Sequence, residues 1–164
     1  MERKPIVILV SGPARPRPED SANAEEVGRL LALAGATVLT GGRGGVMEAA
    51  SRGAREAGGA TMAVLPGSDA SDSPPNPYVM QAVYTGMEDA RNAILVRSAD
   101  AVIAIGGGWG TLSEIALARK IGRPVVLLDS WELAPADPAV GPMPPEAGGP
   151  AEAVKLAIDA AHRG

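Results

Sequence analysis

The chain has 164 residues, of which 46% are hydrophobic and 2% aromatic, and it carries a formal net charge of −4 at pH 7. This length predicts a single domain spanning residues 1–164, and the acidic charge argues against a nucleic-acid partner, which normally needs a clustered basic face. Because the chain has no cysteine and only one histidine, disulfides and thiol nucleophiles are excluded, no metal site is expected, and a cytoplasmic setting is the default.

The first predicted element is a buried strand at 5–10, a continuous apolar run that ends at Ser11 and Gly12. Such runs are typical of parallel strands covered on both faces. The run ends in a turn rather than a small-residue cleavage site, so we interpret it as a strand and not as a signal peptide. No apolar stretch approaches the ~20 residues that span a bilayer, so no membrane partner is expected.

A Pro- and Arg-rich loop is predicted at 14–20, before the first helix. Asn23 and Glu26 have capping-box spacing, and apolar residues then recur at helical intervals until Gly35, which predicts a helix over that stretch. The next elements in order are a strand at 36–40, a glycine loop at 41–45, a helix at 46–57 and a strand at 60–65.

The second half of the chain begins with a long loop of Asp, Ser, Pro and Gly at 66–77, a length that is often functional. A short strand is a candidate at 79–84, and Thr85 with Glu88 repeats the capping-box spacing before a helix that ends near residue 97. The remaining elements are a strand at 101–105, a glycine turn at 106–110, a helix at 111–121, a strand at 124–128, an irregular Pro- and Gly-rich segment at 129–150, and a closing helix at 151–161.

This alternation of strands and amphipathic helices predicts an α/β fold, a Rossmann-like, doubly wound parallel sheet in one domain. In such folds ligands bind beyond the carboxyl ends of the strands. The loops that look functional all follow strands, so we expect them to meet at one edge of the sheet. The sequence therefore predicts one ligand site.

The most informative segment is 99–119, in which a buried strand leads through four glycines to a helix that carries Thr111 and Glu114. This arrangement aims free backbone N–H groups and the positive end of the helix dipole at one point, which suits a phosphate. The spacing of Thr111 and Glu114 is also that of a capping box, a purely structural role. The preceding glycines favour the phosphate site, and both roles remain open.

Two common phosphate motifs are absent. The P-loop needs Gly-Lys before Ser or Thr, and the chain has no Gly-Lys pair, so an ATPase of that class is excluded. The dinucleotide fingerprint needs a third glycine where Thr111 stands, although Asp129 ends the next strand where a ribose-binding acid would lie. Binding of NAD is therefore a minor alternative.

The segment from Gly106 to Glu114, GGGWGTLSE, resembles the P-G-G-x-G-T-x-x-E signature of the LOG family, the cytokinin-activating phosphoribohydrolases. The glycine loop that starts at Gly41 and the pair Met87 and Arg91 are similar to that family's other motifs, and the likeness runs from about residue 7 to 128. The chain is more similar still to an uncharacterised bacterial branch of the same superfamily, which includes molybdenum cofactor carrier proteins.

The resemblance implies a site that binds a nucleoside 5′-monophosphate or a similar phosphate ligand. Glu114 would stabilise an oxocarbenium-like transition state or orient water during hydrolysis of the N-glycosidic bond to free base and ribose 5-phosphate, with Arg91 pairing with the phosphate or the leaving base. The residues expected to contact the nucleotide or its phosphate are Ser11, Gly12, Gly41, Gly42, Met47, Met87, Gly107, Gly108, Trp109, Gly110 and Thr111.

Several of these residues also have a structural alternative, and the glycines at 41–45 could form only a tight turn between strand and helix. Arg91 could pair with Glu88 on a solvated helix face, where we assign Glu88 to a cap with Thr85. Trp109 could stack on a base or pack against a neighbouring element or a partner subunit. The methionines could fill the core instead of contacting a base.

Two substitutions separate this chain from the LOG pattern: Gly106 stands in place of the family's proline and Asn92 in place of the lysine that follows its arginine. Both positions belong to the fingerprint of active phosphoribohydrolases. The alternative function is therefore a non-catalytic carrier of a phosphate-bearing cofactor such as the molybdenum cofactor. No cofactor is required for hydrolysis, and the resemblance also implies a homodimer. A DNA-handling protein of related fold is a further alternative that the acidic charge disfavours.

Overall fold

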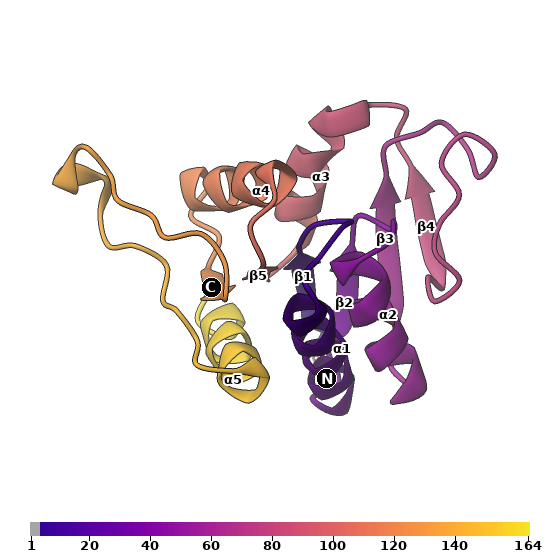
Figure 1. The fold of residues 1–164 in the computed structure, drawn as a ribbon, viewed down its shortest axis with the longest axis horizontal. Helices are drawn as coiled ribbons and strands as arrows, with labels where there is room; N and C mark the ends of the chain where they lie inside the picture. Colours follow the sequence, from indigo (N-terminus) through magenta and orange to yellow (C-terminus); the bar gives the residue numbers. More distant parts are fainter. Residues whose placement is uncertain (1–3) are drawn as a thin grey trace.

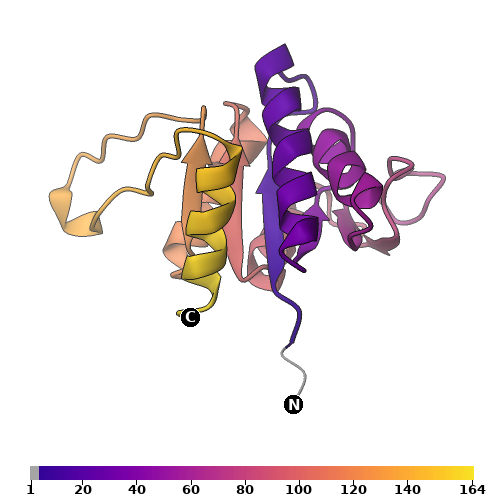
Figure 2. The ribbon, with the colours of Figure 1, turned by 90° about the horizontal axis from the view of Figure 1, so that it is seen from below.

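The continuous apolar runs of the sequence form the strands of a parallel sheet that lies between two layers of helices (Figure 1; Figure 2). The computed structural model describes residues 4–164. The strands are β1 (Val7–Ser11), β2 (Thr37–Thr40), β3 (Thr61–Leu65), β4 (Gln81–Tyr84), β5 (Ala101–Ile105) and β6 (Val125–Leu128). The helices are α1 (Pro18–Leu33), α2 (Val46–Glu56), α3 (Arg91–Ser98), α4 (Trp109–Lys120) and α5 (Pro150–Ala161), with 3₁₀ turns η1 (Glu88–Ala90) and η2 (Pro138–Val140).

The order of the strands is β4-β3-β2-β1-β5-β6, and every pair is parallel. Strands β1 to β4 lie next to one another in the order of the sequence, and β5 then pairs with the other side of β1. The direction of winding thus reverses between β1 and β5, and a crevice opens there beyond the carboxyl ends of the strands. This topology confirms the predicted Rossmann-like, doubly wound α/β fold.

Helices α1, α2 and α5 cover one face of the sheet, and α3 and α4 cover the other (Figure 1). Each face has its own buried apolar cluster, and all five residues of β5 are buried between the two. Burial on both faces explains why β5 is a continuous apolar run in the sequence. The last residues of β1 and β5, Ser11 and Ile105, are buried as a result, and the loops that form the site start from them.

The start of α1 differs from the prediction. The helix begins at Pro18, within the predicted loop, because proline has the φ angle of a first helical residue and lacks only an N–H group that would be unpaired there. The Asp20 carboxylate accepts the backbone N–H of Arg17 at 3.1 Å and so closes this end of the helix. The predicted capping box at Asn23 is therefore wrong, and Asn23 instead donates to the Asp129 carboxylate at 3.0 Å.

The predicted helix after Thr85 is also shorter and later than expected. The Thr85 hydroxyl donates to the Leu65 carbonyl and accepts the Met87 N–H, while the Glu88 N–H donates to the Pro66 carbonyl. Thr85 and Glu88 thus form no capping box, and Glu88 adopts a left-handed φ of 50° before η1. The regular helix α3 starts only at Arg91.

Two irregular segments of the prediction have defined places in the fold. In the 66–77 loop, Asn76 is buried and donates its backbone N–H to Gly42 and its side-chain amide to Arg43, both at 2.9 Å. This loop therefore braces the glycine loop after β2. The 129–149 segment extends away from the body of the protein and returns so that Ala147 and Pro145 hydrogen-bond with Leu127 of β6 (Figure 1).

Candidate functional site

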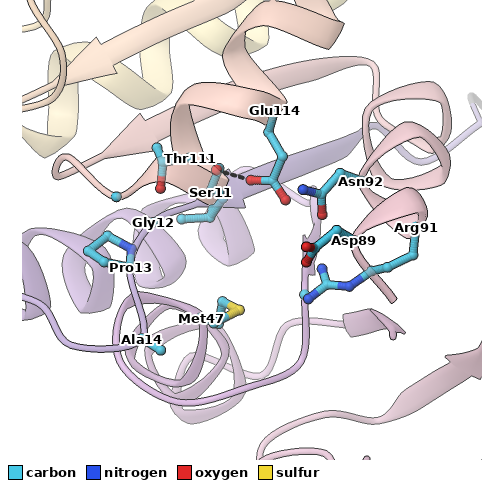
Figure 3. A pocket seen from close by; sticks show the side chains of 14 residues that line it. Ser11, Gly12, Pro13, Ala14, Met47, Asp89, Arg91, Asn92, Thr111 and Glu114 are labelled. Carbon is cyan, nitrogen blue, oxygen red and sulfur yellow. Dashed lines mark hydrogen bonds between the residues drawn. The ribbon is translucent and has the colours of Figure 1, made fainter. Parts of the chain in front are cut away.

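A cavity of about 290 Å³ opens at the crevice between β1 and β5, beyond the carboxyl ends of the strands (Figure 3). Four segments that are far apart in the sequence meet here: the loop after β1, the glycine loop after β2, the start of α3 and the start of α4. Its lining residues are Val10, Ser11, Gly12, Pro13, Ala14, Gly41, Met47, Asp89, Arg91, Asn92, Gly108, Gly110, Thr111 and Glu114.

Two glycines allow the walls of this cavity to approach one another. A side chain at Gly41 would place its Cβ 2.5 Å from Nη1 of Arg91, and one at Gly12 would place it 2.7 Å from the carbonyl oxygen of Ile105. Both distances are below normal contact, so only glycine fits without displacing its neighbours. At Gly41 the missing side chain lets the Arg91 guanidinium lie against the backbone.

The amino end of α4 points unpaired donors at the cavity. As at every helix start, the first backbone N–H groups of α4 have no intrahelical partner. The residue before the helix is Gly108, which has no side chain that could accept a hydrogen bond from them. Two backbone carbonyls of the preceding loop accept hydrogen bonds from the segment after β6. The Ser130 hydroxyl donates to the Gly106 carbonyl at 2.6 Å, and the Trp131 indole N–H donates to the Gly108 carbonyl at 3.1 Å. In a trans peptide the N–H points in the direction opposite to the carbonyl of the same peptide. The N–H groups of Gly107 and Trp109 therefore point away from Ser130 and Trp131.

The Thr111 side chain adds to this array of donors. Thr111 is only 3% exposed, and its hydroxyl has no hydrogen-bond partner. A buried hydroxyl without a partner is costly, and it is relieved when a ligand supplies an acceptor. Together with the dipole of α4, the N–H groups and this hydroxyl form an array of donors of the kind that suits an anion.

Glu114 lies in the cavity wall one turn further along α4, where its carboxylate accepts a hydrogen bond from the Ser11 hydroxyl (Figure 3). Burial raises the pKa of Glu114 to about 7, against the smaller opposite effects of the Ser11 hydrogen bond and the Arg91 charge. The carboxyl can therefore gain or lose a proton near neutral pH. Thr111 and Glu114 do not form the capping box that was the alternative to a functional site.

Arg91, at the first position of α3, faces Glu114 across the cavity. Its Nε atom is buried and has no hydrogen-bond partner. Burial lowers the pKa of the Arg91 guanidinium, Glu114 and Asp89 oppose that effect, and the nearby positive charge of Arg43 adds to it. The alternative pairing of Arg91 with Glu88 does not occur among the ion pairs of residues 4–164.

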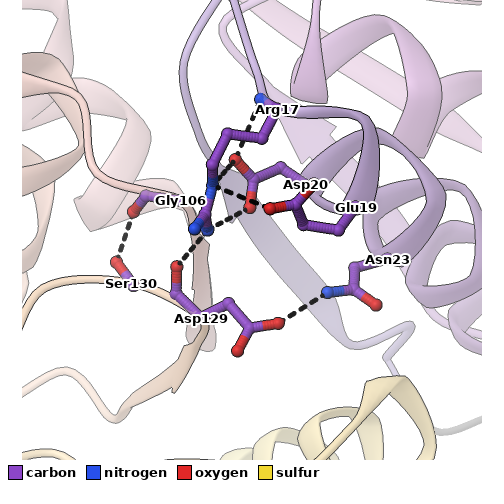
Figure 4. Close-up of polar contacts among 7 residues, drawn as sticks. All are labelled: Arg17, Glu19, Asp20, Asn23, Gly106, Asp129 and Ser130. Atoms are coloured by element: carbon purple, nitrogen blue, oxygen red, sulfur yellow. Dashed lines mark hydrogen bonds and ion pairs between the residues drawn. The ribbon is translucent and has the colours of Figure 1, made fainter.

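A second hollow of about 410 Å³ adjoins the first and shares Pro13 and Gly108 with it. Its floor is a polar network between the loop after β1 and the end of β6 (Figure 4). The Arg17 guanidinium binds the buried Asp20 carboxylate at 2.7 Å and the Asp129 carbonyl at 3.1 Å. These bonds hold Asp129 at a left-handed φ of 48°, a conformation that non-glycine residues seldom adopt.

Most of the predicted site residues line the first cavity. These are Ser11, Gly12, Gly41, Met47, Arg91, Gly108, Gly110, Thr111 and Glu114. Four others lie elsewhere. Gly42 packs against β3, Met87 is 48% exposed outside the cavity, and Gly107 lines the second hollow. Trp109 is 78% exposed, and its ring lies 5.1 Å from that of Trp131 with the two planes tilted by 42°.

Five lining residues were not among the predicted site residues: Val10, Pro13, Ala14, Asp89 and Asn92. The first three lie directly before or after Ser11 and Gly12. Asp89 lies two residues before Arg91, and Asn92 directly follows it. Adjacency to residues already singled out was the available signal. Asn92 is also buried, and its amide lies 3.5 Å from the Ser113 hydroxyl.

Two further observations bear on the type of site. Within residues 4–164 no group of three or more His, Asp or Glu side chains is arranged to hold a metal ion. In the same part of the chain, no helix has the length and apolar character needed to cross a bilayer.

Comparison with known proteins identifies relatives over most of the chain. Residues 5–141 match the SLOG cluster4 family. An uncharacterised protein of Archaeoglobus fulgidus is 45% identical over 105 residues, which are 64% of this chain and 68% of that protein. The molybdenum cofactor binding protein of Rippkaea orientalis has a similar structure, with a TM-score of 0.85 and 39% identity over 94% of this chain and 96% of its own.

The molybdenum cofactor carrier protein of Chlamydomonas reinhardtii is also similar, with a TM-score of 0.82 and 31% identity over 98% of this chain and all of its own. These matches agree with the predicted kinship to molybdenum cofactor carriers. They favour the carrier alternative over the phosphoribohydrolase, since both structures are named for binding or carrying the molybdenum cofactor.

Proposed function

The chain belongs to the SLOG cluster4 family, and we propose that this member binds the molybdenum cofactor and holds it without chemical change. The cofactor is the protein's cargo: a pterin whose side chain carries a dithiolene that binds molybdenum and ends in a phosphate. Similar proteins from Rippkaea orientalis and Chlamydomonas reinhardtii are named as a binding protein and a carrier of this cofactor.

The observation that carries the proposal is the array of unpaired donors at the start of α4. The N–H groups after Gly108 and the buried Thr111 hydroxyl have no protein partner on the cavity side. A phosphate accepts several hydrogen bonds at once and is favoured by the helix dipole, so it matches this array. We therefore assign the phosphate of the cofactor to the start of α4.

The size of the site also fits a ligand that extends beyond its phosphate. The two adjoining hollows measure about 290 and 410 Å³, within the range of roughly 300–1,000 Å³ typical of small-molecule pockets. They meet at Gly108, next to the proposed phosphate site. A ligand anchored there can extend into either hollow.

The test uses cofactor released anaerobically from a molybdoenzyme and mixed with purified protein. After gel filtration, molybdenum is measured by mass spectrometry and the pterin by fluorescence of its oxidised form. We expect equimolar molybdenum and pterin to elute with the protein. Thr111→Val should weaken binding by roughly ten-fold, the loss of one strong hydrogen bond to a charged group.

Thr37→Val is the matched control, because Thr37 begins β2 at the opposite edge of the sheet. It should bind cofactor like the unchanged protein. Failure of the unchanged protein to retain either pterin or molybdenum would refute the proposal.

A phosphoribohydrolase is the second candidate, supported by the position of Glu114 and Arg91 in one cavity beside the anion site. The test incubates the protein with a panel of nucleoside 5′-monophosphates, including N6-substituted AMP, and looks for released base. Release that disappears in Glu114→Gln would establish this activity. Absence of release, with cofactor retained, would leave the carrier function alone.

A further inference from the structure

The cavity contains a second set of unpaired donors, on the side opposite Thr111. In Figure 3, Thr111 and the Arg91 guanidinium lie on opposite sides of the opening, with Ser11 and Glu114 between them. The two groups belong to different elements, α4 and α3. One phosphate at the start of α4 therefore does not account for Arg91.

The Arg91 guanidinium is held in place but is incompletely paired. It lies against the backbone at Gly41, where a Cβ would be 2.5 Å from Nη1 and 3.0 Å from Nη2, with the Met47 sulfur beside it. Its Nε is buried without a partner. A planar guanidinium with a free Nε is suited to bind an oxyanion through two parallel hydrogen bonds.

A second arginine approaches the same place. Arg43, in the glycine loop after β2, is close enough for its charge to lower the pKa of Arg91. Its backbone is fixed because Asn76 donates to the carbonyls of Gly42 and Arg43. The exposed positive charge of Arg43 adds to that of Arg91, and a nearby positive charge favours an anion bound at Arg91.

The acidic groups that face Arg91 do not fill this role. Glu114 and Asp89 both act on its charge, but within residues 4–164 neither forms an ion pair with it. Glu114 is engaged by the Ser11 hydroxyl, and Asp89 is exposed to solvent in η1. In a chain of net charge −4, a half-buried arginine in a cavity without a bound carboxylate stands out.

We propose that Arg91 forms a second anion subsite in this cavity, so that the site takes one ligand with two separate anionic groups. The inference rests on the proposed function, because it assigns a second contact to the same ligand. In that ligand the second group is the oxyanionic metal end, with the phosphate at the start of α4. The site then discriminates metal-loaded cofactor from metal-free pterin.

The first experiment uses inorganic phosphate as the probe and follows ¹H–¹⁵N correlation spectra, including the arginine Nε–H signals. We expect two groups of signals to shift with separate binding curves. Backbone signals of Gly108, Gly110 and Thr111 report the helix site, and the Nε–H signal of Arg91 reports the second subsite. Thr111→Val should weaken the first curve only.

Variants of the two arginines separate this subsite from general charge effects. Arg43→Gln should weaken the Arg91 curve by roughly two- to five-fold, as for a partly exposed charge, and leave the helix curve unchanged. Arg97→Gln is the matched control, since it removes the same charge from the other end of α3 and should change neither curve.

The outcomes distinguish this inference from the proposed function. Shifts at α4 without a shift of the Arg91 Nε–H would overturn the second subsite and leave the phosphate site intact. A single binding curve that disappears in Thr111→Val would overturn it as well. No shift at α4 would instead refute the proposed phosphate site.

A second experiment uses the cofactor itself. Molybdenum-loaded cofactor should bind more tightly than the metal-free pterin, and Arg91→Gln should reduce this preference by roughly ten-fold, as expected for loss of a bidentate ionic contact. Equal affinity for both forms in the unchanged protein would contradict the assignment of the metal end to this subsite.

Discussion

Glu114→Gln should change how the stability of the protein depends on pH. The Glu114 carboxyl is buried in the cavity wall, and burial raises its pKa to about 7 from an ordinary value of 4.5. Between these two values the folded protein keeps a proton that the unfolded chain releases. The free energy of unfolding therefore falls as pH rises from about 4.5 to about 7, and the loss is complete above that range.

The magnitude follows from the two pKa values. A pKa difference of one corresponds to 1.36 kcal/mol, so ionisation of Glu114 costs the folded state roughly 3 kcal/mol at alkaline pH. Glutamine has nearly the same shape, can still accept from the Ser11 hydroxyl, and does not ionise. Glu114→Gln should thus match the unchanged protein in acid and exceed its stability above neutrality by up to roughly 3 kcal/mol.

The assay is urea unfolding of both proteins at about pH 5 and about pH 8, with the difference between the two proteins compared across pH. All other groups titrate alike in the two proteins, so their contribution cancels when the difference in free energy of unfolding between the proteins is compared at the two pH values. In thermal unfolding the gain at alkaline pH should appear as roughly 6–12 °C in Tm for a chain of this size. A difference that is the same at both pH values would refute the reasoning, because Glu114 would then titrate as in the unfolded chain.

Three other substitutions, Gly106→Pro, Gly42→Ala and Thr111→Val, test the segments that build the site, and Gly35→Ala is a control for the second. Gly106→Pro should destabilise the protein by about 3 kcal/mol or more in urea unfolding, because Gly106 has a φ of 72° and proline is fixed near −65°. A neutral effect would show that the loop has another conformation. Gly42→Ala should cost roughly 1–3 kcal/mol, since Gly42 has a φ of 78° and its Cβ would lie 2.8 Å from Ala63 and Leu65. Gly35→Ala, with a φ of 75° but open space, should cost roughly 1 kcal/mol, and an equal loss at both would contradict the close packing. Thr111→Val should leave stability unchanged or raise it by about 1 kcal/mol, because the hydroxyl it removes is buried and unpaired; a marked loss of stability would mean that Thr111 has a structural partner.

The fold and the location of the site follow from features that a sequence displays directly. The apolar run 101–105 and the glycines after it predict a buried strand that leads through a turn into a helix, and both elements are present. That the turn binds an anion stays a prediction. Because all strands are parallel, every loop that follows a strand reaches the same edge of the sheet. The joining of Ser11, Arg91 and Glu114 in one cavity is a consequence of this topology.

Other features depend on contacts between distant segments and were not predictable from local pattern. The capping-box spacings at Asn23 and Thr85 are indistinguishable in sequence from real caps, but both side chains find partners elsewhere, on Asp129 and on Leu65. The brace from Asn76 to the glycine loop spans 33 residues. Periodicity does not encode such pairings, since each is decided only when the sheet has assembled.

The state of Glu114 also bears on which chemistry the cavity supports. A carboxyl that stabilises an oxocarbenium ion has to be ionised, whereas a carboxyl with a pKa of about 7 is protonated in about half of the molecules at neutral pH. Asn92 lines the same cavity and stands where the LOG pattern has lysine. An ammonium group there would oppose the effect of burial and lower the pKa of Glu114.

With asparagine at position 92, no ammonium group there opposes the effect of burial on the pKa of Glu114. The protonated form of Glu114 does not repel an anion bound one helical turn away at Thr111. Binding of a phosphate at the start of α4 raises the pKa of Glu114 further, because a nearby negative charge disfavours ionisation. Occupancy of the site and protonation of Glu114 therefore favour each other. A carboxyl that becomes neutral when the ligand binds suits a protein that holds an anion better than one that cleaves a glycosidic bond.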